Sequence, residues 1–180
     1  MMMVYIFLAD GFEEIEALAP LDILRRGGID VQTVGITGKY VTGAHGITVK
    51  ADILPEDFAD ESAEAVFLPG GGLGTENLDA SEFVKNAVKH AYDAKKLICA
   101  ICAAPSILGK MGLLRGKTAV CYPGFEKYLD GAEVLNTHVA ECGNVITANG
   151  MGAAYKFGFA ILARLRGEDK ANAVRRQILY

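Results

Sequence analysis

The chain has 180 residues, of which 51% are hydrophobic and 22% charged, and its formal net charge at pH 7 is −4. This composition is typical of one compact domain with a substantial core, which we expect to span residues 1–180. The acidic balance argues against nucleic acid as the main partner. No apolar run approaches the length of a membrane span, so we expect no membrane partner.

The first elements along the chain predict a βαβ unit. Residues 4–8 form an apolar strand, a turn follows at 10–12, and a helix runs from about Glu13 to Arg26 with apolar residues in helical rhythm. Gly27 and Gly28 end this helix, and residues 29–36 give a second strand. Two strands joined by a helix favour a parallel sheet.

The later elements continue this alternation of strands and helices. In order we expect an antiparallel excursion over 40–53, strands at 65–68, 97–101 and 116–121, a helix capped by Ser81, two short strands within 139–148, and helices over 150–165 and 168–179. The fold class this predicts is a three-layer α/β sandwich.

Cysteine and histidine usage bears on compartment and metal content. The apolar start of the chain is too short for a secretory leader, and four cysteines without such a leader favour a reducing, cytoplasmic setting. His45, His90 and His138 show no zinc-ligand spacing with the cysteines, so we expect no metal.

Cys102 lies where a buried strand turns sharply into a helix. Pro105 suits the first turn of that helix, and Ala103 and Ala104 let the chain bend. The arrangement resembles a nucleophile elbow, with the helix end expected to lower the pKa of the thiol. Two other interpretations stay open: a small buried hydrophobe, or a redox pair of Cys102 with Cys99.

Further polar and glycine-rich positions are predicted at the same edge of the sheet. Glu13 and Glu14 suit the start of a helix, whereas Glu16 falls on the face expected to pack on the sheet. Its carboxyl should therefore point along the edge where α/β folds bind ligands. The loop over 69–74 is either a plain turn or an oxyanion hole with the N–H groups of Gly71 and Ala103; the dinucleotide pattern is not matched.

Four stretches in the same order resemble the ThiJ/PfpI superfamily, in the branch of the parkinsonism-associated protein deglycase and its bacterial relatives. They cover residues 8–16, 22–29, 68–71 and 100–105. The resemblance implies a flavodoxin-like sandwich of the class I glutamine amidotransferase type. It also implies a cofactor-independent glyoxalase or deglycase that converts 2-oxoaldehydes such as methylglyoxal to hydroxy acids through a hemithioacetal.

The same resemblance implies roles for individual residues. Cys102 becomes the reactive residue and Glu16 its carboxyl partner, while Gly71 and Ala103 become oxyanion donors beside Gly70 in the substrate site. The family is usually dimeric, and the residues that match positions near the partner's site are Asp22, Arg26 and His45.

Three positions depart from the relatives. Ala103 stands where the protease-like branch carries His, which argues against an adjacent Cys–His dyad. Tyr122 stands where the deglycase has His, either as a polar contact of the site or as a turn residue packed on the core. The stretch 149–152 replaces an Arg-Gly-Pro-Gly run. Two further functions therefore remain open: a redox sensor or stress chaperone through Cys102 oxidation, and a thiol peptidase or amidase.

Overall fold

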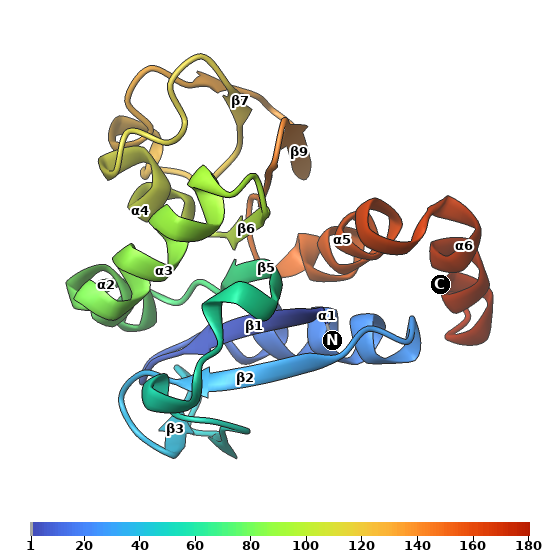
Figure 1. Cartoon of the computed structure of the whole chain (residues 1–180). Coiled ribbons are helices and arrows are strands. Elements are labelled where there is room, and N and C mark those ends of the chain that lie inside the picture. Colours follow the sequence, from blue (N-terminus) through green and yellow to red (C-terminus); the bar gives the residue numbers. More distant parts are fainter. Residues whose placement is uncertain (1) are drawn as a thin grey trace.

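The centre of the molecule is a six-stranded sheet, seen in a computed structural model that describes residues 2–180 (Figure 1). Five strands are parallel and the edge strand β9 is antiparallel to β10. Across the sheet the strands are β2 (Val31–Gly35), β1 (Met3–Leu8), β5 (Ala63–Leu68), β6 (Leu97–Ile101), β10 (Val145–Ala148) and β9 (Val139–Cys142). The parallel strands thus follow the flavodoxin-like order, which confirms the predicted fold class.

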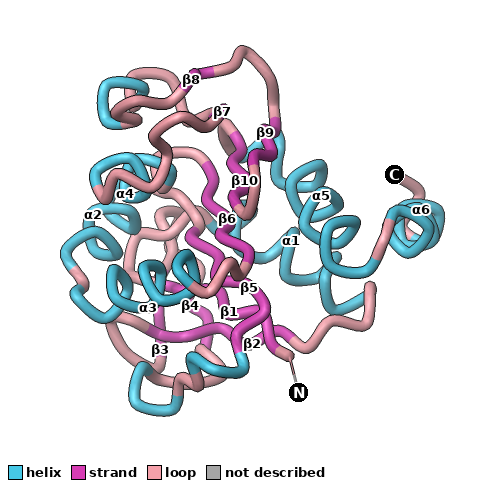
Figure 2. Tube along the Cα trace, turned by 45° about the horizontal axis from the view of Figure 1, so that its top comes forward, coloured by secondary structure: helices cyan, strands magenta, loops and turns pink. Residues whose placement is uncertain are grey.

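Helices cover both faces of the sheet, and each face buries its own apolar cluster (Figure 2). On one face lie α1 (Glu14–Arg26) and α5 (Ala154–Arg166), with α6 (Glu168–Gln177) packed outside α5. The other face carries α2 (Gly72–Ala80), α3 (Glu82–Asp93) and α4 (Pro105–Lys110). Ser81 caps α3 as predicted, because its Oγ accepts the Val84 N–H at 3.3 Å.

Smaller elements lie outside the central sheet. The antiparallel excursion is a hairpin of β3 (Tyr40–Thr42) and β4 (Thr48–Lys50), as expected. Short 3₁₀ turns occupy Pro55–Asp57, Asp60–Ser62, Glu126–Tyr128 and Met151–Ala153. Within residues 2–180, every helix is too short or too polar to cross a membrane.

Two predictions about these elements are wrong. Of the strand expected at 116–121, the structure contains only the two-residue strand β7 (Thr118–Ala119). This strand pairs with β8 (Glu133–Val134) outside the central sheet. The sequence pattern predicts no helix between the glycine-rich loop at 69–74 and Ser81, but α2 begins at Gly72. Glycine is a poor helix former, so the local sequence does not predict a helix that begins at this position. The helix is stabilised by the packing of Leu78 in the core.

Candidate active site

Cys102 sits on a strained turn directly after β6. Its φ is 65°, a left-handed conformation that costs a non-glycine residue about 1–2 kcal/mol. Backbone hydrogen bonds hold the turn on both sides: the Cys102 N–H donates to the Ala148 carbonyl at 2.8 Å, and the Cys102 carbonyl accepts the Tyr122 N–H at 2.7 Å. The predicted elbow is therefore present, and its side chain is half-buried.

The glycine loop after β5 brings backbone donors to this elbow. Gly71 has a φ of 91°, and a Cβ there would run into the backbone of Gly11 and Phe12, so only glycine fits. The N–H groups of Gly71 and Ala103 hydrogen-bond the Cys102 sulfur. The two predicted oxyanion donors and the predicted nucleophile thus lie together at the carboxyl ends of β5 and β6.

Glu16 reaches the same point from the first turn of α1. Its side chain is 1% exposed, its Oε2 accepts the Gly70 N–H at 3.0 Å, and its carboxyl shares a hydrogen bond with the Cys102 thiol. Burial raises the pKa of Glu16 to about 7, and the nearby Glu13 adds to this rise, against the hydrogen bonds from Cys102 and Gly70. The Glu16 carboxyl therefore exchanges a proton near neutral pH.

The pKa of Cys102 differs from the expected direction. Burial, followed by the charge of the Glu16 carboxylate, raises it to about 12, against the lowering effect of the Gly71 and Ala103 N–H groups. The expectation of a lowered thiol pKa considered only the end of α4, not the buried carboxylate opposite. Two anions cannot coexist cheaply in this contact, so Cys102 and Glu16 together lose their first proton near neutral pH and keep the second well above it.

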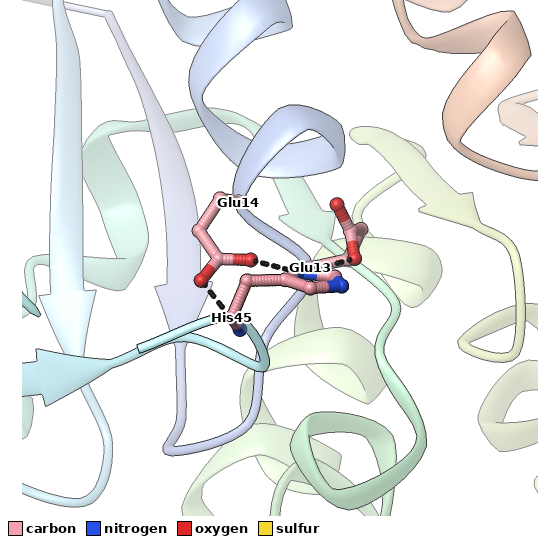
Figure 3. A group of neighbouring side chains, drawn as sticks. All are labelled: Glu13, Glu14 and His45. Carbon is pink, nitrogen blue, oxygen red and sulfur yellow. Dashed lines mark hydrogen bonds and ion pairs between the residues drawn. The ribbon is translucent and has the colours of Figure 1, made fainter. Parts of the chain in front are cut away.

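The other acids at the start of α1 hold the hairpin between β3 and β4. Glu14 is 3% exposed; its Oε1 accepts the His45 N–H at 2.8 Å and its Oε2 pairs with His45 Nδ1 at 2.9 Å. Glu13 Oε2 lies 3.3 Å from the same nitrogen, and Figure 3 shows how the three side chains gather. The hairpin tip is thus fixed against the helix that carries Glu16.

The electrostatics of this cluster follow from these contacts. Burial alone would raise the pKa of Glu14, but hydrogen bonds from the His45 side chain and from backbone N–H groups outweigh it and lower the pKa. The hydrogen bond to Glu14 raises the pKa of His45. Among residues 2–180, Glu13, Glu14 and His45 form the one group whose donor atoms gather within 4.8 Å, as a cation would need. The ion pairs of His45 with Glu13 and Glu14 account for the short distances between these atoms.

Other positions singled out in the sequence have simpler surroundings. Tyr122 is 50% exposed rather than packed on the core, and its ring lies beside Gly150. Asp22 and Arg26 form an exposed ion pair of 2.6 Å one turn apart on α1. Cys99 is fully buried in β6. It is a free thiol, as are Cys102, Cys121 and Cys142.

Sequence reasoning missed the role of Glu14, which it assigned to the helix dipole. Its partner His45 comes from a hairpin far along the chain, so no local pattern joins them. The sequence feature that relates to this contact is Gly43, because a side chain at that position would collide with the Glu14 carboxylate.

A profile of the DJ-1/PfpI family matches residues 2–164. Parkinson disease protein 7 homolog of Danio rerio is 35% identical over 179 residues, covering 97% of this chain and 95% of that protein. Glutathione-independent glyoxalase DJR-1.2 of Caenorhabditis elegans is 29% identical over 163 residues, covering 90% and 87%. The chain spans only 39% of the length of Protein DJ-1 homolog B of Arabidopsis thaliana, to which it is 37% identical over 171 residues.

Solved structures agree with this assignment. A DJ-1 superfamily protein of Salmonella typhimurium superposes with a TM-score of 0.93 at 36% identity, covering 100% of this chain and 99% of the other. The oxidized form of Toxoplasma gondii DJ-1 gives a TM-score of 0.95 at 31% identity, with the same coverage. The likeness extends over the whole chain.

Proposed function

Because the chain belongs to the DJ-1/PfpI family, we propose that it is a cofactor-independent enzyme that converts 2-oxoaldehydes such as methylglyoxal to hydroxy acids through Cys102. The observation that carries this proposal is the buried contact between the Cys102 thiol and the Glu16 carboxyl, with two backbone N–H groups at the sulfur. This contact pairs a nucleophile with a group that exchanges protons near neutral pH.

The first step is addition to the aldehyde. The Cys102 thiolate forms a bond to the aldehyde carbon, and the electron pair of the carbonyl moves to its oxygen, giving a hemithioacetal. The N–H groups of Gly71 and Ala103 stabilise the charge that develops on this oxygen. The left-handed turn at Cys102 keeps the sulfur at the sheet edge, where a small carbonyl compound has access.

The second step moves a proton between carbons. Glu16 first donates its proton to the hemithioacetal oxygen. As a carboxylate it then takes the proton from the carbon bonded to sulfur and returns it to the neighbouring carbon, while the hydroxyl proton on the first carbon passes to the oxygen of the second, so that the first carbon is oxidised and the second reduced. The product is a thioester, and water then hydrolyses it to a 2-hydroxy acid and the free thiol. No external oxidant or reductant is needed. Deglycation of early adducts of amines would use the same hemithioacetal.

One relative's name supports this chemistry: the C. elegans protein is called a glutathione-independent glyoxalase. The oxidized T. gondii structure supports a second candidate function, a redox sensor. In that function, peroxide would oxidise Cys102 of this chain stepwise to a sulfinic acid and release water at each step. Glu16 would hydrogen-bond the new oxygen.

The test is a methylglyoxal assay without glutathione, comparing wild type with Cys102→Ser and measuring lactate. We expect lactate formation by wild type and its loss in the variant. A wild type that forms no lactate, but whose Cys102 is readily oxidised by peroxide, would favour the sensor.

A further inference from the structure

A pocket of about 550 Å³ lies where β6 and β10 begin, at the edge of the central sheet opposite Cys102. A smaller pocket of about 260 Å³ adjoins it, because Lys95, Asn144 and Arg164 line both. Strand β6 separates these pockets from the elbow by roughly 16 Å, since Cys102 follows its last residue. They are therefore distinct from the candidate active site, and none of the chemistry proposed above uses the residues that line them.

Two cationic groups meet at the turn between β9 and β10. Arg164 Nη2 donates to the Gly143 carbonyl at 2.6 Å. Lys117 Nζ lies over the Tyr92 ring, 5.6 Å from its centroid, and a Cβ on Gly143 would lie 3.5 Å from this nitrogen. Within residues 2–180, neither cation forms an ion pair. The C-terminus of α5 favours a cation at Arg164, but Lys117 lies in no helix. Like charges gathered without a counter-ion repel one another, and a bound anion would relieve this repulsion.

The acids that line the two pockets are already paired with cations outside the lining. Glu64 accepts two hydrogen bonds from Arg166, at 2.7 and 2.9 Å, and Asp93 pairs with Lys89 at 2.5 Å. These carboxylates are therefore engaged elsewhere and do not neutralise the lysines and the arginine of the pocket wall. The wall presents a local positive charge on a chain whose net charge is −4.

Lys95 stands at a backbone position that favours glycine. Its φ is 57°. Just after α3, its N–H donates to the Tyr92 carbonyl at 3.0 Å, and the Lys96 N–H donates to the Ala91 carbonyl at 2.8 Å. This is the Schellman arrangement, in which glycine usually takes the left-handed position. A strained lysine at a pocket wall points to a use for its side chain. Asn144 fixes the next lysine, because its Nδ2 donates to the Lys96 carbonyl at 2.9 Å.

We propose that this basic pocket binds the phosphate group of a small phosphorylated molecule, with the organic part of that molecule against Tyr92. Arg164 uses one nitrogen for the Gly143 carbonyl, and its remaining donors are available to a ligand. A phosphate monoester presents three oxygens and nearly two charges at neutral pH, which suits a guanidinium beside several ammonium groups better than a carboxylate does. The site is independent of the function proposed for Cys102.

The experiment titrates the protein with AMP, inorganic phosphate and adenosine and measures each Kd by calorimetry. AMP should bind, inorganic phosphate should bind more weakly because it lacks an organic part, and adenosine should not bind. Adenosine that binds as tightly as AMP, or AMP that fails to bind at millimolar concentration, would overturn the phosphate site. Inorganic phosphate that binds as tightly as AMP would overturn the role of the organic part and assign the pocket to free phosphate.

Two variants locate the site. Lys95→Gly should raise the melting temperature of the free protein, because glycine relieves the left-handed position, yet raise the Kd for AMP at least about tenfold, the scale of one charge-assisted hydrogen bond. Lys117→Met keeps the packing on Tyr92 and should weaken AMP binding similarly.

Lys50→Met, an exposed lysine on β4 outside both pockets, is the matched control and should leave the Kd unchanged. Wild-type affinity in both pocket variants, or an equal loss in the control, would overturn the proposal. These measurements need no turnover, so they stand or fall separately from the function proposed for Cys102.

Discussion

The Glu16 carboxyl and the Cys102 thiol share a hydrogen bond across the sheet edge, one from the start of α1 and the other from the turn after β6. Both groups are largely withdrawn from water, and their charges would repel. The pair therefore behaves as one titrating unit, which loses its first proton near neutral pH and keeps the second well above it. The pH behaviour and the reactivity of the site follow from this relationship.

The first prediction concerns stability. Burial raises the pKa of Glu16 from 4.5 to about 7, so the folded protein retains a proton that the unfolded chain releases. The stabilising contribution is complete below about pH 4.5 and is lost as pH rises through 7. This linkage is worth at most on the order of 3 kcal/mol.

Urea unfolding of wild type and Glu16→Gln at several pH values measures this contribution. The difference between their free energies of unfolding should shift in favour of the variant between pH 4.5 and 7. A difference that is constant over this range would mean that the Glu16 pKa is not raised.

The second prediction concerns alkylation. Iodoacetamide should label Cys102 before the other three cysteines. Once the pair has lost its first proton, we expect the remaining proton to move to Glu16 as the sulfur reacts, because the Gly71 and Ala103 N–H groups stabilise the thiolate. The labelling rate should rise with a midpoint near pH 7 or below and then level off. A rate that still climbs above pH 9 would indicate an ordinary thiol of raised pKa. Peptide mass spectrometry identifies the labelled residue, with Cys102→Ser as control.

The third prediction concerns the close approach of the loop after β5 to Glu16 and Cys102. A Cβ at Gly70 would collide with the Glu16 carboxylate and lie 2.6 Å from Cys102 Cβ. Gly70→Ala should therefore push the pair apart and lower methylglyoxal turnover by roughly a hundredfold, as small misplacements of reacting groups do. Gly72→Ala is the matched control, because nothing lies within 4 Å of its added Cβ. Equal activity of the two variants would contradict the geometry described here.

The fourth prediction is a homodimer. Ile15 on α1 and Tyr155 on the neighbouring α5 are 44% and 47% exposed, and such exposed apolar side chains suit an interface. Light scattering at micromolar concentration should give the mass of two chains. Ile15→Lys should raise the dissociation constant at least about tenfold, whereas Val134→Lys, on β8, should not. A single monomeric peak for wild type would refute the dimer.

Local patterns in the sequence predicted most of the central sheet and the elbow. Apolar strands alternating with amphipathic helices predicted a parallel sheet, although the strand predicted at 116–121 does not join it. The run from Leu97 to Pro105 predicted the turn at Cys102. The pKa of Cys102 could not be predicted in this way, because it depends on burial and on a carboxylate from another helix. For the same reason the partnership of Glu14 with His45 became visible only in three dimensions.

The most direct test of the central claim is the turnover of methylglyoxal by Glu16→Gln, measured together with the intact mass of the protein incubated with methylglyoxal. Glutamine keeps a hydrogen-bond donor beside Cys102 but cannot exchange a proton. We predict that the variant still gains the mass of one methylglyoxal at Cys102, while lactate formation falls by at least roughly a hundredfold. Turnover close to that of wild type would contradict the proton-transfer role of Glu16.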